Sequence, residues 1–434
     1  MYNSPRNVQS CRFEEVMMSR RRTLNVCLFG ALASSLFALP AAAQDTDSEE
    51  DVRPEMKEML EDDEGSEARG IVVSDNFPGE DDEEPAGWTV EFFGYLRTQY
   101  TAIQDDPNLE EFGRNDGFII ADARFGFLGY LDNGLGFELE VDAGVPRPTE
   151  EANTAIGEVV TRLRDGYVFY QPHPLFRASA GQFKVPFDIE ELLSTANILF
   201  VERSVGSRGV EGVEGPNREG LSVGRQVGVR IDSDPFFFVT EDDGPGVSYA
   251  LAATNGQSAN RSLNDNDQAA FYGRVNLHWG EIARLGGGAY YNDRTIGELP
   301  DLIGETQTGW TADLTVAAAG FSLLANVVQV EFEPPEEVGA EPARTGLSYQ
   351  AQVAYEEPFF GLQPAYRFAY LDPDTDREGA EAGIRFESLT YHTVGLNYNA
   401  KTYPLRLMLN YTITAEEQLE IDNDRFDALV QVEW

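Results

Sequence analysis

Residues 181–204 read GQFKVPFDIEELLSTANILFVERS, and this stretch contains the sharpest change of pattern in the chain. Its first residues alternate between polar and apolar side chains, with Gln182 and Lys184 on the polar face, which predicts a strand. Pro186 ends that strand, because proline has no N–H to donate to a sheet ladder. Strand alternation returns only at Arg225, so a long loop follows, and long loops inside compact folds are often functional.

The same alternation runs through residues 88–434, in segments of about ten residues that end at turn residues. In residues 405–413 every odd-numbered position is apolar, and Arg406, Asn410 and Thr412 stand between them. This pattern indicates strands that bury one face. A soluble sandwich would give the same alternation, so other features have to decide the fold class.

Three features favour a membrane barrel. After residue 43 no apolar run is long enough for a transmembrane helix, whereas the segments match the about 9–11 residues of a tilted membrane strand. The polar faces carry charges in strand after strand, such as Asp122, Asp313 and Glu433, which a dry core would not hold unpaired. The connections alternate between long and short, and about sixteen strands can be counted, an even number as in bacterial barrels.

We therefore predict an all-β fold, a transmembrane antiparallel β-barrel of about 16 strands. The parity of long and short connections places both termini in the periplasm. The long connection at residues 187–223 is the third loop from outside, and we expect it to fold inward and narrow the pore.

The chain divides into three parts. Residues 1–43 fit a signal peptide, with translation starting at Met17 or Met18 and an A-x-A cleavage site at the end. Residues 44–87 contain eighteen acidic and three basic residues, which predicts a disordered periplasmic segment acting as a spacer, a tether or a cation-binding tail. Residues 88–434 form one barrel domain.

The charge and the histidines limit the function. The formal net charge is −43, which excludes nucleic acid as a partner because phosphate would be repelled. His173, His278 and His392 are far apart and have no metal or nucleophile spacing, so no catalytic residue, metal or cofactor is expected. A barrel hydrolase using His278 is strongly disfavoured. The acidic clusters at 264–267 and 372–376 do not fit an EF-hand and are interpreted as solvated loop tips.

Three motifs around the long loop resemble the phosphate-selective porin O and P family: GQFKxPF at 181–187, F-x-E-R-S at 200–204 and G-R-x-x-G at 224–228. The resemblance covers essentially all of residues 88–434. It implies a homotrimeric outer-membrane channel of a Gram-negative bacterium, with the third loop as the constriction. The aromatic C-terminal residue, Trp434, resembles the signal read by the outer-membrane assembly machinery, and membrane lipid and lipopolysaccharide are further expected partners.

The resemblance also implies anion selectivity from lumen arginines and a lysine cluster. The chain departs from this pattern, because it has three lysines and only Lys184 lies at the constriction. Arginines are plentiful, and their guanidinium forks match phosphate oxygens. The candidate constriction and solute-binding residues are Gln182, Lys184, Arg203, Arg208, Arg218 and Arg225. The candidate lumen-lining residues, inward by parity, are Arg97, Arg124, Arg230, Arg274, Arg367 and Arg406.

Several functions stay open. We expect passive diffusion of small hydrophilic or charged solutes, including anions such as phosphate. Inward acids such as Glu138 and Glu140 are as evident in the sequence as the arginines. Each arginine can therefore instead pair with a carboxylate across the lumen, as in a general or cation-preferring porin. A structural or surface-binding barrel with an occluded pore is a third alternative. We expect the apolar run at 198–201 to pack the loop on the inner wall, Arg203 to pair with a wall carboxylate or line the pore, and Lys184 to face the lumen.

Overall fold

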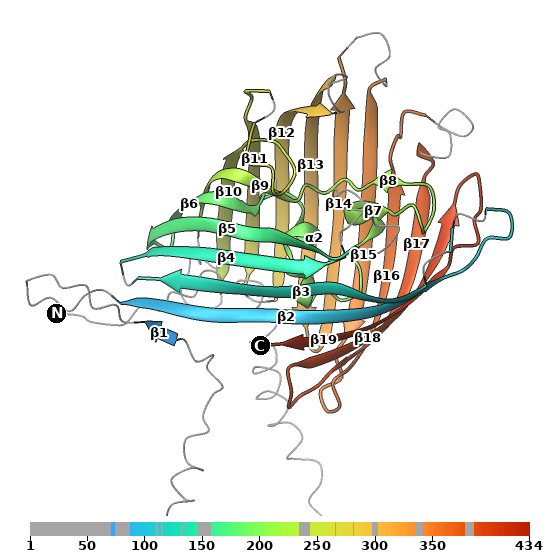
Figure 1. Ribbon diagram of the computed structural model, residues 1–434, viewed down its shortest axis with the longest axis horizontal. Helices are drawn as coiled ribbons and strands as arrows, with labels where there is room; N and C mark the ends of the chain where they lie inside the picture. The colour runs from blue at the N-terminus through green and yellow to red at the C-terminus, as the bar shows by residue number, and fades with distance from the viewer. Residues whose placement is uncertain are drawn as a thin grey trace, which may run out of the picture.

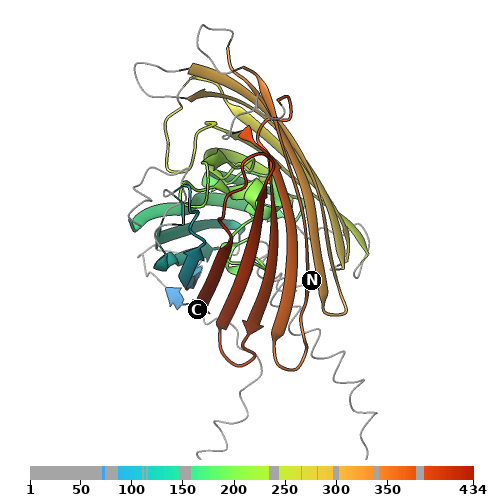
Figure 2. The ribbon, with the colours of Figure 1, turned by 90° about the vertical axis from the view of Figure 1, so that its right-hand side faces the viewer.

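The computed structural model describes residues 71–73, 87–109, 112–113, 116–131, 133–145, 158–233, 244–264, 266–280, 282–296, 303–335, 342–377 and 386–434. The expected signal peptide and nearly all of the expected acidic segment lie outside these residues. In the described part the chain forms a sheet that curves round on itself, with loop segments inside it (Figures 1 and 2).

Sixteen strands form the barrel, as the alternation predicted. They are β2 (Trp88–Ile103), β3 (Gly117–Tyr130), β4 (Leu135–Gly144), β5 (Val160–His173), β6 (Phe176–Lys184), β9 (Arg225–Asp232), β10 (Pro245–Thr254), β11 (Ala270–Trp279), β12 (Ala283–Ile296), β13 (Ile303–Ala318), β14 (Phe321–Glu333), β15 (Arg344–Tyr355), β16 (Leu362–Asp372), β17 (Leu389–Asn399), β18 (Leu405–Glu416) and β19 (Arg425–Glu433).

Every neighbouring pair is antiparallel, and the ring closes where β19 pairs with β2 from Arg425 opposite Ile103 to Glu433 opposite Tyr95. Closure leaves no open edge along this seam, which removes a template for aggregation. A short strand, β1 (Ile71–Val73), pairs with the first three residues of β2. Among the described residues, no helix is long and apolar enough to cross a membrane.

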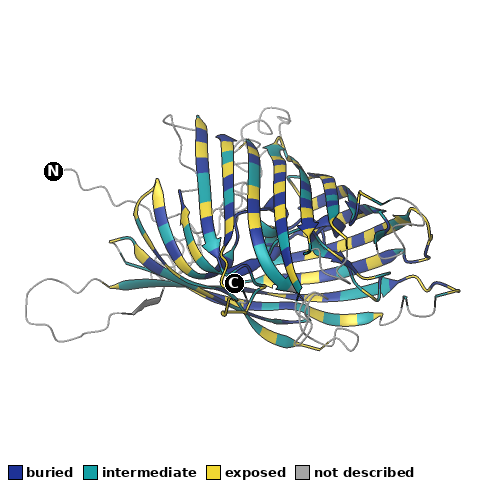
Figure 3. Ribbon diagram, turned by 90° about the horizontal axis from the view of Figure 1, so that it is seen from above, coloured by how far each residue is buried: buried dark blue, intermediate teal, exposed yellow. Residues whose placement is uncertain are grey.

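Exposure alternates along the strands, as the bands of Figure 3 show. In β18, Tyr411 is 46% exposed on the outer face, whereas Asn410 is 3% exposed on the inner face. Apolar and aromatic side chains face outward, where lipid would lie, and polar side chains face the lumen. The prediction from the period-two pattern, with apolar side chains outward and polar side chains inward, is therefore confirmed.

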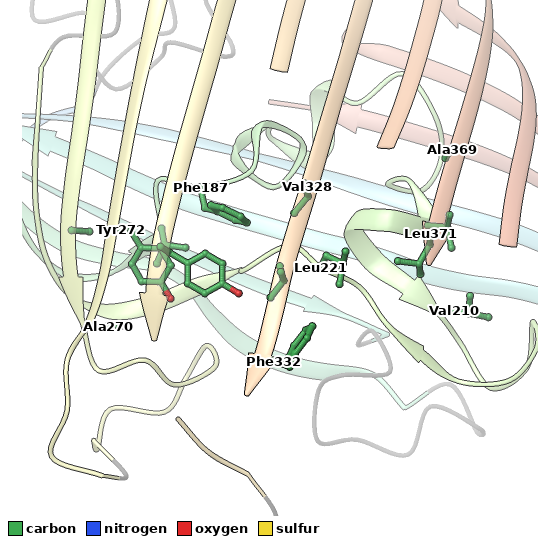
Figure 4. Packing of buried hydrophobic residues seen from close by; sticks show 14 of the residues in the cluster. Phe187, Val210, Leu221, Ala270, Tyr272, Val328, Phe332, Ala369 and Leu371 are labelled. Carbon is green, nitrogen blue, oxygen red and sulfur yellow. The ribbon is translucent and has the colours of Figure 1, made fainter. Parts of the chain in front are cut away.

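The connection from β6 to β9, here called loop 3, folds into the lumen. It contains α2 (Ile189–Leu192), η4 (Thr195–Asn197), α3 (Val205–Arg208), β7 (Gly209–Val210) and β8 (Arg218–Glu219). Apolar side chains of the loop pack on inward residues of the wall, and Phe187 meets Tyr290 edge-on with ring centroids 4.7 Å apart (Figure 4). Phe200 packs against Ala354 and Ala365, so the run at 198–201 contacts the inner wall as expected.

The two ends of the barrel domain meet at Gly94. Its N–H donates to the carbonyl of Trp434 at 3.2 Å, and its carbonyl accepts from the N–H of Trp434 at 3.1 Å. A Cβ at Gly94 would lie 2.4 Å from the carbonyl oxygen of Arg124 and 2.8 Å from the Trp434 ring. Only glycine therefore fits at this point of the seam.

We expect Gly94→Val to lower the free energy of unfolding by about 1–3 kcal/mol, because the added atoms overpack the seam. The measurement is urea unfolding of the barrel in detergent micelles, with the shift of the gel band on heating as a second readout. Gly304→Val is the control, since Gly304 of β13 has no neighbour within 4 Å of an added Cβ. Equal unfolding midpoints for both variants would contradict the tight seam.

Candidate functional site

Loop 3 is held by wall side chains that donate to its backbone carbonyls. The wall arginines reach four of these carbonyls: Arg274 to Phe187 at 2.6 Å, Arg406 to Ala196 at 3.2 Å, Arg97 to Val201 at 2.7 Å, and Arg367 to Glu202 at 2.9 Å. Asn397 adds a bond to Leu199 at 2.9 Å. Four of the six candidate lumen arginines therefore anchor the loop.

The candidate lumen arginines also meet carboxylates, which is the arrangement that the alternative interpretation described. The pairs are Arg97 with Asp122 at 2.9 Å, Arg124 with Glu140 at 3.2 Å, Arg230 with Asp232 at 2.7 Å, and Arg274 with Asp313 at 2.6 Å. Arg367 lies 3.7 Å from Glu190 of loop 3. These arginines form an inward-facing network of ion pairs and not a row of isolated positive charges.

Arg203 has a different place from the one expected. Its side chain is 2% exposed, and its ion-pair partner is Glu191 of the same loop, at 3.1 Å. It also donates to the carbonyls of Glu190 and Leu193. The expectation that Arg203 lines the pore is wrong, because the side chain is buried among these groups of loop 3. The buried side chain connects α2 to the segment after Phe200 through these contacts.

Arg208 and Arg218 are likewise buried in ion pairs. Arg208 contacts Glu214 at 2.7 Å, and Glu214 also contacts Arg425 of β19. Arg218 lies 3.8 Å from Glu387. Where Arg208 faces β16–β19, a space of about 10 Å³ is left, which is about the room for one water.

Of the other candidates, Lys184 and Arg225 line an open cavity, whereas Gln182 does not. Gln182 donates to the carbonyls of Leu163 and Arg164 and accepts from the N–H of Asn260, so its side-chain amide is hydrogen-bonded to backbone groups. Lys184 donates to the carbonyls of Leu192 and Leu193 at 3.0 and 2.9 Å. It thus contributes a charge to the cavity and a tether to α2.

This cavity, here called the vestibule, has a volume of about 290 Å³. It lies between loop 3 and the wall formed by β2–β6 and β9–β12. Its charges are divided between two arcs of the wall, counted over the described lining residues. The basic arc, from β6 to β12, holds six cations, Arg177, Lys184, Arg225, Arg230, Arg274 and Arg284, and one acid, Asp232. The acidic arc, from β2 to β5, holds four acids, Glu91, Glu138, Glu140 and Asp165, and one cation, Arg124.

Sequence analysis did not single out Arg177 and Arg284 as lumen residues. Their signal was present, since each stands at an inward position near the start of a strand that follows a short turn. The apolar part of the lining was also not foreseen, because it combines Phe93 and Leu128 of the wall with Ile189 and Leu192 of loop 3.

Two clusters in the vestibule contain residue types that can bind a metal ion or act in catalysis. Carboxylate oxygens of Glu138, Glu140 and Asp165 lie within 4.8 Å of one another, a spacing that could hold a metal ion. Arg225 already contacts two of these carboxylates, at 2.6 Å from Asp165 and 3.4 Å from Glu140. The sequence analysis expected no metal site, and this pairing supplies positive charge to the cluster without one.

The second cluster is a serine and a histidine. The Oγ of Ser248 lies 2.9 Å from Nε2 of His278, and Asn276 donates to the same Oγ at 3.1 Å. The pair therefore suits a hydrogen-bonded wall network better than nucleophilic catalysis.

Arg203 tests the internal order of loop 3. We expect Arg203→Met to broaden the distribution of single-channel conductance, because Glu191 then loses its buried cation. Breaking such a pair costs about 3–5 kcal/mol of local stability. The double variant Arg203→Met with Glu191→Leu should narrow the distribution again, since an apolar pair of similar volume is often tolerated. If Arg203→Met alone kept the wild-type distribution of single-channel conductance, the role of Arg203 in ordering loop 3 would be contradicted.

Glu211 makes loop 3 sensitive to pH. Burial, and then the charge of Glu214, raise the pKa of Glu211 to about 7. Burial also opposes ionisation of Glu214, but the guanidinium groups of Arg208 and Arg425 outweigh it and lower the pKa of Glu214 to about 2. Glu214 is therefore charged at all working pH values, and Glu211 titrates near neutrality.

The folded-state pKa of Glu211 lies above its ordinary value of 4.5. Its contribution to loop stability is thus fully present below about pH 4.5 and is lost as the pH rises through about 7. We expect current noise from loop motion to grow between about pH 5 and about pH 9. Glu211→Gln should remove this dependence. Equal growth of the noise in wild type and Glu211→Gln would exclude Glu211 as its source.

Comparison with known proteins agrees with this architecture. The family model for the Gram-negative porin matches residues 30–403. No curated protein matches the chain. Solved structures match at low identity, and their likeness concerns the fold.

The outer membrane channel DcaP of Acinetobacter baumannii is 14% identical, with a TM-score of 0.55 over 80% of this chain and 97% of its own. Salmonella typhi OmpF, in complex with daunomycin, is 11% identical, with a TM-score of 0.53 over 80% and 98%. The anion-selective porin from Comamonas acidovorans is 12% identical, with a TM-score of 0.52 over 80% and 100%. The family match spans most of the chain and the described strands close into the same kind of barrel, so the chain belongs to the Gram-negative porin family and forms an outer-membrane channel for small solutes.

Proposed function

We propose that the protein is a homotrimeric general diffusion porin for small hydrophilic and charged solutes, with a modest preference for anions. The observation that carries this proposal is the lining of the vestibule, where the described residues contribute seven cations and five carboxylates. This local excess of positive charge opposes the net charge of −43 of the whole chain. Charged walls of low dielectric focus such a local field on passing ions.

Two fold relatives support parts of the proposal. One matching structure is the trimer form of OmpT from Vibrio cholerae, which has a TM-score of 0.51 and 10% identity. The porin from Comamonas acidovorans is named as anion-selective. A trimer and a preference for anions therefore fit proteins of this fold.

Phosphate is one of several anions that we propose the channel passes. The resemblance to phosphate-selective porins implied a lysine cluster at the constriction, and this chain offers Lys184 alone there. The Nζ of Lys184 donates to two loop carbonyls, so its donors are directed at loop 3. Selectivity then follows from the summed charge of the basic arc, and we expect phosphate and chloride to be separated by size and charge only.

We further propose that residues 1–43 direct export and that residues 44–87 form a disordered acidic segment in the periplasm, with both termini on that side. The composition of these segments supports this assignment. Trp434, which meets Gly94 at the seam, is proposed as the residue read by the assembly machinery. Lipopolysaccharide is proposed to surround the ends of the long loops.

The test is a planar-bilayer recording with Lys184→Gln. The wild type should give ohmic steps in threes and a reversal potential in a salt gradient that favours chloride over potassium. Glutamine keeps an N–H donor for the loop carbonyls but removes the charge, which at about 4 Å in water is worth about 1 kcal/mol. We expect the chloride-to-potassium permeability ratio to fall by roughly two- to five-fold.

Lys401→Gln is the matched control, because Lys401 pairs with Glu356 in short turns outside the lumen. It should leave the permeability ratio unchanged. A wild type without any conductance would favour the alternative of an occluded structural barrel. A ratio that favours potassium would establish the cation-preferring alternative.

A further inference from the structure

The vestibule gathers positive and negative charge on two neighbouring arcs of its wall, which meet where Arg225 contacts Asp165, and its lining also contains apolar surface. We propose that it is a binding site for zwitterionic solutes of amino-acid size, which bind with the carboxylate at the basic arc and the ammonium at the acidic arc. This inference rests on the proposed channel function, which gives solutes access to the vestibule.

The basic arc offers preorganised donors for a carboxylate. Arg177 and Arg230 share Asp232, which accepts from Arg177 at 2.7 and 2.9 Å and lies 2.7 Å from Nε of Arg230. The guanidinium of Arg230 also lies over the ring of Phe183, 4.9 Å from its centroid, which fixes its plane. Two guanidinium groups that share one carboxylate leave a net positive charge in the wall. A solute carboxylate can complement that charge, because its oxygens match a guanidinium fork.

The acidic arc presents oxygens beside the basic arc, because β5 of the acidic arc pairs with β6 of the basic arc. The carboxylates of Glu138, Glu140 and Asp165 are grouped within 4.8 Å, and Tyr167 donates to Glu138 at 2.6 Å. Arg225 contacts Asp165 and Glu140, and Arg124 lies 3.2 Å from Glu140, so two positive charges are set against three acids at this group. An ammonium group has three donors and no acceptor, which suits a site rich in carboxylate oxygens.

The vestibule also has apolar surface for the side chain of such a solute. Ile189 and Leu192 of α2 and Phe93 and Leu128 of the wall contribute apolar surface to the lining. The volume of about 290 Å³ lies near the lower end of ligand pockets, which begin at about 300 Å³. A solute of one amino acid, with an apolar side chain, has the size and the polarity for this space.

The division of charge favours a zwitterion over a simple ion. An anion gains from the basic arc but is repelled by the acidic arc, and a cation meets the reverse. A zwitterion that lies across the two arcs gains at both ends. Low-dielectric walls strengthen both interactions relative to bulk water.

The experiment measures block of the ion current by three probes that share one ring. Phenylalanine carries both charges, 3-phenylpropanoate lacks the ammonium, and phenethylamine lacks the carboxylate. We expect phenylalanine to reduce the current at a concentration at least about ten-fold lower than either single-charge probe, which corresponds to about 1.4 kcal/mol. Equal blocking concentrations for the three probes would overturn the inference. Stronger block by 3-phenylpropanoate would show a plain anion site instead.

Substitutions then locate the site. Arg284→Gln in the basic arc and Glu138→Gln in the acidic arc should each raise the blocking concentration of phenylalanine at least about five-fold. Arg294→Gln is the matched control: Arg294 shares strand β12 with Arg284, lies near its other end and pairs with Glu305 at 2.9 Å. It should leave the block unchanged, and an equal effect of all three variants would overturn the inference.

The conductance without probes separates the two claims. A wild type with no ion current would overturn the proposed porin function. A normal ion current without preferential block by phenylalanine would overturn this inference alone. The shift of the gel band on heating shows that each variant has folded, so a folding defect is not read as lost binding.

Discussion

Loop 3 lies inside the barrel, and its backbone carbonyls there need hydrogen-bond donors. Buried polar groups without partners are costly, so a chain segment that crosses a lumen must be matched by the wall. Here the matching donors are long side chains, with Arg274, Arg406, Arg97 and Arg367 each reaching one loop carbonyl. The position of the loop is thereby determined by the wall, and the form of the remaining space follows from it.

This constraint changes the meaning of the inward arginines. An arginine that donates to loop 3 and also meets a carboxylate has a structural role, and it adds little free positive charge to the solute path. The vestibule, which we propose as part of the solute path, is lined by β2–β6 and β9–β12. There the basic arc adjoins the acidic arc, so a chain with a net charge of −43 can present a positive stretch of wall to its channel.

Much of the fold was predictable from sequence, because period two assigns each side chain to one face of a strand. Residues 405–413 illustrate this, since parity alone separated the exposed Tyr411 from the buried Asn410. The inward loop was predictable from Pro186 and the long gap before Arg225. The partner of Arg203 was not, because parity says nothing within an irregular loop, and Glu191 is brought to it by local turns. The pairing of Ser248 with His278 depends on strand register, which alternation does not determine.

The position of loop 3 can be measured directly with one engineered disulfide. A Cβ built on Gly206 of α3 would lie 2.6 Å from the Cβ of Ser348 in β15, so a small shift reaches the about 3.5–4.5 Å of a disulfide. The native cysteines, Cys11 and Cys27, both fall within residues 1–43. We predict that Gly206→Cys with Ser348→Cys forms a disulfide on mild oxidation and that the oxidised channel keeps its wild-type conductance. Failure to form the disulfide, or a conductance that changes when it forms, would contradict a loop held on the wall by the arginines.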